Sequence, residues 1–144
     1  SYNRKSTGVC AVDEEYNLYL VGQWRYGAGY YSWEIPEGTG DTGEKPSETI
    51  KRELKEETGI TANKWDYIGK IYPNNVTTSE EAHIFLAMEL QMGESQTEDY
   101  EKITVRKVSF AHAIEEIKTG KITDAISVAG IMMTYLQLKN KIKI

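Results

Sequence analysis

The chain has 144 residues, which is the size of one average domain, and its 40% hydrophobic and 27% charged residues exclude a disordered or fibrous protein. With 22 acidic and 17 basic residues the net charge is −5, which disfavours nucleic acid or an anionic membrane as a partner. No apolar run approaches the roughly 18 residues that cross a bilayer. We therefore expect a single domain over residues 1–144, located in the cytoplasm.

The first part of the chain predicts strands and a glycine-rich loop. Residues 7–25 read as two strands joined by a polar turn at 13–17, which predicts a hairpin that enters the core. Cys10, in the first of these strands, has apolar neighbours and reads as a core residue rather than a nucleophile. Frequent glycines between residues 26 and 43 indicate looped backbone around one short strand at 32–35.

The strongest helix signal covers residues 46–58. Pro46 suits the first helical turn, and Gly59 suits the left-handed position that follows the last turn. Ser109 is expected to cap a second helix, and Thr123 or Asp124 a third. Further strands are predicted at 65–72, 82–90 and 103–108. Strands interspersed with three helices predict one α/β domain with a mixed sheet covered by helices.

The helix at 46–58 gathers three carboxylates on one face. At about 100° per residue, Glu56 and Glu57 fall about 60° and 40° to either side of Glu53. Lys51 and Lys55 occupy the opposite face. Such a cluster is either a solvated acidic surface or a site for a hard cation that prefers oxygen ligands, such as Mg²⁺ or Mn²⁺. Position on the helix leaves both interpretations open.

The wider spacing decides between them. The segment 38–60 reads GTGDTGEKPSETIKRELKEETGI. It resembles the signature box of the Nudix hydrolases at every defining position, and a chance match is on the order of 10⁻⁹ per window. The resemblance implies a metal-dependent hydrolase with the Nudix fold, an α/β/α sandwich with a mixed β-sheet.

The resemblance also assigns roles within the box. It implies that Glu53 and Glu57 are the principal metal ligands at the catalytic centre, and that Glu56 binds further metal directly or through water. The backbone carbonyl of Glu37 is implied as an extra ligand, and Mg²⁺ as the cofactor, with Mn²⁺ as the substitute. The resemblance implies a supporting role in the geometry of the loop and helix for three further residues: Gly38, Glu44 and Arg52.

Segments outside the box resemble one subgroup, the ADP-ribose and nucleoside-diphosphate-sugar pyrophosphatases. The similar segments are residues 23–25, 33–38, 72–87 and 120–125. The chain departs from the subgroup at Glu37, where a small residue is common, and at Asn74 and Asn75, where a proline–glycine turn is common. The resemblance implies hydrolysis of ADP-ribose or a related nucleoside diphosphate sugar to a nucleoside monophosphate and a sugar phosphate.

Five residues outside the box are candidate substrate contacts, three by the same resemblance and two by their aromatic character. Arg25 would bind the diphosphate, for which a guanidinium fork is well suited. Glu34 would contact the nucleoside or terminal ribose, or pair across a dimer interface, and Glu80 would orient substrate or assist the metals. Trp24 and Trp33 would stack a base or sugar, or form an intersubunit surface. Each also has an ordinary structural interpretation.

The subgroup resemblance implies a general base in the acidic loop after the box, within residues 91–101. Glu101 is the first candidate because it stands just before the next predicted strand, and Glu98 is the second. The subgroup resemblance also implies a homodimer. Two alternatives stay open: a nucleoside-triphosphate pyrophosphatase, and a nucleotide-sugar sensor without turnover, which the complete set of carboxylates disfavours. The sequence leaves open the preferred base and sugar and the number of metal ions.

Overall fold

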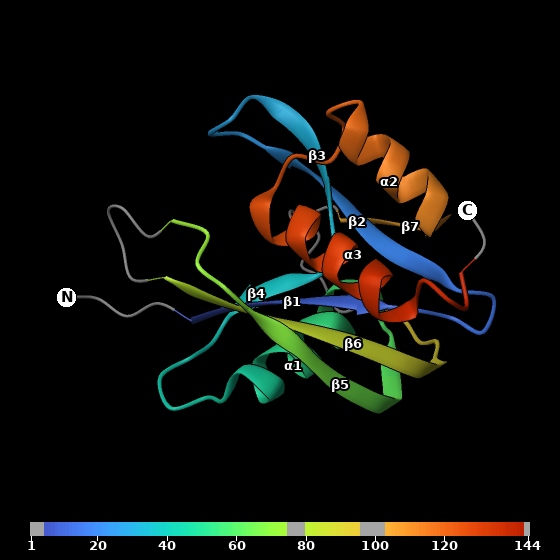
Figure 1. The fold of residues 1–144 in the computed structure, drawn as a ribbon. Helices are drawn as coiled ribbons and strands as arrows, with labels where there is room; N and C mark the ends of the chain where they lie inside the picture. Colours follow the sequence, from blue (N-terminus) through green and yellow to red (C-terminus); the bar gives the residue numbers. More distant parts are fainter. Residues whose placement is uncertain (1–4, 75–79, 96–102, 143–144) are drawn as a thin grey trace.

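A computed structural model describes residues 5–74, 80–95 and 103–142 of the chain. The elements are β1 (Lys5–Ala11), β2 (Asn17–Arg25), β3 (Tyr30–Glu34), β4 (Glu37–Thr39), α1 (Pro46–Thr58), β5 (Thr61–Ile71), β6 (Glu81–Gln91), β7 (Thr104–Ser109), α2 (Phe110–Lys118) and α3 (Ala125–Leu138) (Figure 1). The predicted helix at 46–58 is confirmed, as are the helices that follow Ser109 and Asp124. Strand β4 is an addition that the sequence does not predict.

The strands form two sheets. In the four-stranded sheet, ordered β4-β1-β6-β5, β1 runs parallel to β6 and antiparallel to β4, so the predicted mixed sheet is confirmed. The three-stranded sheet, ordered β3-β2-β7, is antiparallel throughout. The sequence predicts only one sheet, and the second carries several of the candidate substrate contacts.

The four-stranded sheet is covered on both faces. On one face, Ile50 and Leu54 of α1 pack with Val9 and Phe85. On the other face, Cys10 and the apolar side of α3 belong to a separate buried cluster. Figure 1 shows α1 and α3 on opposite sides of this sheet, which is the predicted α/β/α sandwich. No helix in the described part of the chain is long and apolar enough to cross a membrane.

The predicted hairpin at 7–25 is wrong, although its polar turn is present. Strands β1 and β2 lie in different sheets, and a single bridge between Val12 and Leu18 joins the ends of the two segments. The physical reason is that β4 and β6 occupy both edges of β1, so β2 pairs with β3 and β7 instead. The carboxylate of Asp13 accepts hydrogen bonds from the N–H groups of Glu15 and Asn17, which closes the turn.

The C-terminal end of α1 is held by a close backbone crossing. Gly59 has φ +78°, and its N–H donates to the carbonyl of Lys55 at 2.8 Å. A Cβ at Gly59 would collide with the backbone carbonyl of Gly93, in the segment after β6. Glycine is therefore required at position 59 for its conformation and for space.

Gly59→Ala is expected to lower the free energy of unfolding by about 3 kcal/mol, because left-handed strain and a backbone collision add together. Gly43→Ala is the matched control, since Gly43 has φ +84° but a Cβ there would meet no described residue within 4 Å beyond its chain neighbours. The control should lose only about 1 kcal/mol. Urea unfolding measures the free energy of unfolding of both variants. Equal losses of stability would show that the backbone crossing at Gly93 does not constrain α1.

Candidate active site

The acidic face of α1 lies directly against β4. A Cβ at Gly38 would collide with the side chain of Glu53, so the close approach of this carboxylate requires a glycine. The carboxylate of Glu57 accepts a hydrogen bond from the backbone N–H of Glu37. Ile50 and Leu54 are fully buried on the same helix, and they anchor it beneath the carboxylates. The two carboxylates are therefore held in place.

The carboxylate of Glu57 is buried and lacks a hydrogen-bond partner for one of its oxygens among the described residues. It is only 9% exposed, and its Oε1 is buried with no hydrogen-bond partner among the described residues. Burial, reinforced by the charge of Glu53, raises the pKa of Glu57 to about 8. Burial also raises the pKa of Glu53. A buried orphaned oxygen among like charges suits a divalent cation, so these residues fit the metal that the sequence implies.

Arg52 and Glu44 form a brace next to these carboxylates. Arg52 donates to both oxygens of Glu44 at 3.0 Å and to Oε1 of Glu53 at 2.9 Å. It also lies 3.4 Å from Oε2 of Glu56. Hydrogen bonds from Arg52 are the main reason that the pKa of Glu44 is lowered to about 2. Glu44 is thus a permanent anion that orients the guanidinium toward the acidic face.

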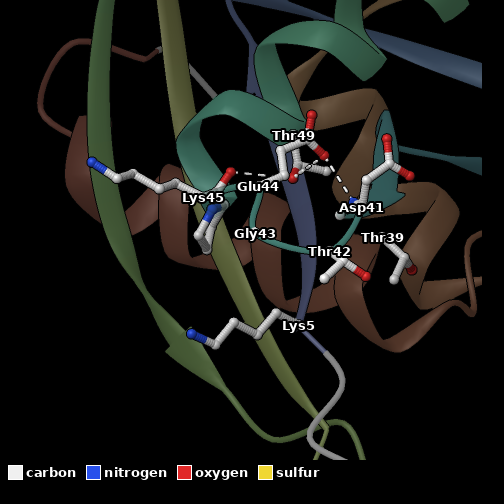
Figure 2. A pocket seen from close by; sticks show the side chains of 10 residues that line it. Lys5, Thr39, Asp41, Thr42, Gly43, Glu44, Lys45 and Thr49 are labelled. Carbon is white, nitrogen blue, oxygen red and sulfur yellow. Dashed lines mark hydrogen bonds between the residues drawn. The ribbon is translucent and has the colours of Figure 1, made fainter.

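Glu44 also fixes the loop that precedes α1. Its Oε1 accepts hydrogen bonds from the N–H of Asp41 and the hydroxyl of Thr49. Figure 2 shows these contacts beside a hollow of about 500 Å³, which Lys5 and Lys45 also line. The loop from β4 into α1 is therefore tied to the same carboxylate that orients Arg52.

Arg25 and Glu34 meet across β2 and β3. Arg25 donates to Glu34 through Nε at 3.0 Å and through a terminal nitrogen at 2.6 Å. The hydroxyl of Ser32 donates to the same carboxylate at 2.6 Å. The charges of Glu34 and Arg25 both act on the pKa of Glu57, so this pair lies within electrostatic reach of the acidic face. Arg25 stays 44% exposed and can still contact a ligand.

A pocket of about 560 Å³ opens beside this pair. Its lining comprises Trp24, Arg25, Tyr26, Gly27, Ala28, Tyr30, Glu34 and Asp124. Trp33 is not among the lining residues. By the register, Trp24 and Trp33 lie on the same face of the β2–β3 pair, opposite Glu34, and Trp24 meets the pocket at the end of β2, where the lining continues into residues 25–28. The guanidinium of Arg106 covers the Trp33 ring at 4.2 Å. The structure thus brings Trp24 to the pocket and keeps Trp33 out of it.

Sequence reasoning missed a second acidic group at this pocket. The sequence marks Asp124 only as a helix cap, and Glu37 only as a backbone ligand. In the structure the Glu37 side chain forms hydrogen bonds with Asp124 and with Ser127. Carboxylate oxygens of Glu34, Glu37 and Asp124 lie within 4.8 Å of one another. The sequence signals for this group are the helix-cap pattern at Asp124 and the position of both residues in segments that resemble the subgroup.

The pKa values of the neighbouring side chains of Glu37 and Asp124 are shifted in opposite directions. Burial and the neighbouring Asp124 raise the pKa of Glu37 well above its usual range. Burial also acts to raise the pKa of Asp124, but hydrogen bonds from Glu37 and Ser127 outweigh it and lower the value. The two side chains therefore form a hydrogen-bonded pair in which Glu37 has the raised pKa and Asp124 the lowered one.

The remaining candidates lie elsewhere. Glu80, just before β6, accepts a hydrogen bond from the Ser6 hydroxyl at 2.8 Å. The expected general bases Glu98 and Glu101 fall outside the described residues. Glu94 is described and exposed, and its backbone lies next to Gly59 at the end of α1. The segment that carries the candidate bases therefore starts beside the acidic helix.

Comparison with known proteins finds a matching family and several similar proteins. The NUDIX domain family matches residues 2–128. An ADP-ribose pyrophosphatase of Bacillus subtilis (strain 168) is 34% identical over 140 residues, covering 96% of this chain and 75% of the relative. An ADP-ribose pyrophosphatase of Mycobacterium tuberculosis is 29% identical over 133 residues, covering 90% and 64%. The crystal structure of an ADP compounds hydrolase superposes with a TM-score of 0.85 at 22% identity, covering 96% and 74%, which shows a shared fold.

Glu57→Gln is expected to stabilise the metal-free protein at high pH. A carboxyl whose pKa rises from 4.5 to about 8 on folding binds its proton more tightly in the folded state, so the wild type loses stability as pH rises through that interval. In EDTA, the variant should gain on the wild type by about 3 kcal/mol between pH 5 and pH 8. Chemical unfolding at both pH values measures this, and parallel pH profiles would show that Glu57 is not destabilised when ionised.

Proposed function

The chain belongs to the NUDIX domain family, and on that premise we propose that it hydrolyses the pyrophosphate bond of ADP-ribose or a related nucleoside diphosphate sugar. The products would be a nucleoside monophosphate and a sugar phosphate. Two relatives named ADP-ribose pyrophosphatase, each aligned over at least 90% of this chain, support the substrate class.

The observation that carries the proposal is the buried, unpartnered Oε1 of Glu57 among the described residues. Together with Glu53 it offers anionic oxygens at a place where a divalent cation would offset their repulsion. We propose that Mg²⁺, or Mn²⁺ in its place, is held by Glu53 and Glu57, with Glu56 and the carbonyl of Glu37 as further ligands. Such an ion neutralises phosphate oxygens and lowers the pKa of a bound water.

The protein's own residues would then orient the substrate. Arg25 offers a guanidinium that Glu34 holds in one orientation, which suits bidentate contact with a diphosphate. The half-exposed ring of Trp24 and the exposed ring of Tyr26 flank the same pocket and can stack on a base or sugar. Glu80 remains a proposed auxiliary residue for substrate or metal.

The proposal includes a cytoplasmic homodimer. Four aromatic side chains of the β2–β3 hairpin, each at least 41% exposed, support an intersubunit surface next to the pocket: Trp24, Tyr26, Tyr30 and Tyr31. A second subunit on this surface would exclude water from the substrate pocket. The net charge of −5 still disfavours nucleic acid as a partner, whereas a small diphosphate would meet a site whose local charge the cations reverse.

The direct test separates the candidate reactions by product. Purified protein with Mg²⁺ is given ADP-ribose, UDP-sugars, GDP-sugars or dNTPs in separate reactions, and phosphorus NMR identifies the products. We expect AMP and ribose 5-phosphate from ADP-ribose. Pyrophosphate from dNTPs, without sugar-nucleotide turnover, would establish the triphosphate reaction instead, and no product from any pool would favour a sensor.

Glu53→Gln is expected to lower kcat at least about 100-fold on the preferred substrate, because a positioned metal ligand is lost. Glu48→Gln is the matched control, since Glu48 is an exposed acid in the first turn of the same helix. It should retain wild-type kcat. Equal activity of the two variants would remove Glu53 from the site.

Glu101→Gln is expected to lower kcat at least about 100-fold with little change in KM, as loss of a general base would. Steady-state kinetics measures both constants. If kcat is unchanged in this variant, the same measurement on Glu98→Gln tests the second candidate.

A further inference from the structure

Asp124 reaches the substrate pocket, yet the proposed chemistry gives it no role. It stands at the N-terminus of α3, where its Oδ2 accepts hydrogen bonds from the N–H of Ser127 at 3.0 Å and from the Ser127 hydroxyl at 2.8 Å. The carboxyl of Glu37 binds the same side chain. A carboxylate accepts about four hydrogen bonds, so these contacts fix Asp124 and leave capacity for a ligand donor.

The other carboxylate in the pocket lining accepts as many hydrogen bonds but is more deeply buried. One oxygen of Glu34 accepts from Arg25, and the other accepts from both Arg25 and Ser32. Glu34 is also only 4% exposed, whereas Asp124 is partly exposed. Of the two acids that line the pocket, Asp124 is therefore the more accessible to a ligand donor.

The pocket combines three chemistries that match one kind of ligand. Arg25 suits a phosphate, the rings of Trp24 and Tyr30 suit the face of a base or sugar, and Asp124 suits a hydroxyl donor. A volume of about 560 Å³ lies within the range of small-molecule sites. Carboxylates recognise ribose in this way in dinucleotide-binding folds, where an acid accepts from the 2′-hydroxyl.

We propose that Asp124 is a specificity-determining residue that accepts a hydrogen bond from a ribose 2-hydroxyl of the substrate. This inference rests on the proposed function and adds to it a selection for ribose over 2-deoxyribose. Glu37 positions Asp124, because it holds the carboxylate between β4 and α3. The glutamate that departs from the subgroup pattern thus acquires a role at the substrate pocket.

The test compares substrate selectivity within each variant. Wild type, Asp124→Asn and Asp124→Ser are assayed on ADP-ribose and on its two analogues that lack the 2-hydroxyl of one ribose or the other. Asparagine and serine are both good helix N-caps, so α3 should persist in both variants. A ratio of kcat/KM values within one variant is also insensitive to the fraction of folded protein.

The wild type is expected to prefer ADP-ribose over one of the analogues by about 10- to 100-fold, the range for a hydrogen bond to a charged group. Asp124→Ser should reduce that preference to about threefold or less, and Asp124→Asn should reduce it partly. Asp13→Asn is the control, because it removes the same charge from a turn outside the pocket lining. It should leave the preference unchanged.

Two results would overturn the inference while leaving the proposed function intact. One is a wild type that hydrolyses all three compounds equally well, and the other is a preference that survives in Asp124→Ser. Calorimetric affinities for the same compounds, measured in EDTA, test the inference without turnover. If the wild type hydrolyses none of them, the proposed function fails, and the ratio of affinities still decides whether Asp124 reads a hydroxyl.

Discussion

The contact between α1 and β4 is the constraint on which the site depends. Gly38 leaves the space into which Glu53 packs, and the backbone of Glu37 binds Glu57. Fully buried Leu54 prevents the helix from moving away. This packing holds like charges together out of water, which is unfavourable without a counter-ion. Under the proposed function, a bound cation would offset this repulsion, so helix packing would contribute to metal affinity.

Two arginines lie at different distances from this contact. Arg52 donates to both oxygens of Glu44 and also to Glu53, so it orients the acidic face of α1. Arg25 is held by Glu34 and faces the pocket, where a phosphate would bind. The overall acidic excess is therefore partly functional. A substrate would experience the local pattern of fixed arginines and bound cations rather than the net charge.

Local signals predicted the helices and the acidic face of α1. Pro46 and Gly59 mark the ends of α1 at the positions that the structure shows, because proline and glycine act through their own backbone geometry. Pairing between distant segments could not be predicted in this way. Strand β2 reads as the hairpin partner of β1, but the edges of β1 are filled by β4 and β6, which no local pattern reveals.

The same distinction applies to the candidate site. Glu53, Glu56 and Glu57 are neighbours on one helix, so periodicity alone gathers them. The contact between Glu37 and Ser127 spans 90 positions of sequence, and only the fold shows that α3 meets β4 at the pocket. The placement of the tryptophans also needed the fold, because Trp24 and Trp33 are equally aromatic in sequence but only Trp24 lines the pocket.

Metal binding at α1 is tested most directly by titrating the metal-free protein with Mn²⁺ and following the free ion by electron paramagnetic resonance. We expect that the wild type binds Mn²⁺ and that Glu57→Gln weakens the affinity by about 10- to 100-fold. Equal affinities in the two proteins would contradict this expectation, because the buried oxygen of Glu57 would then have no part in holding a metal.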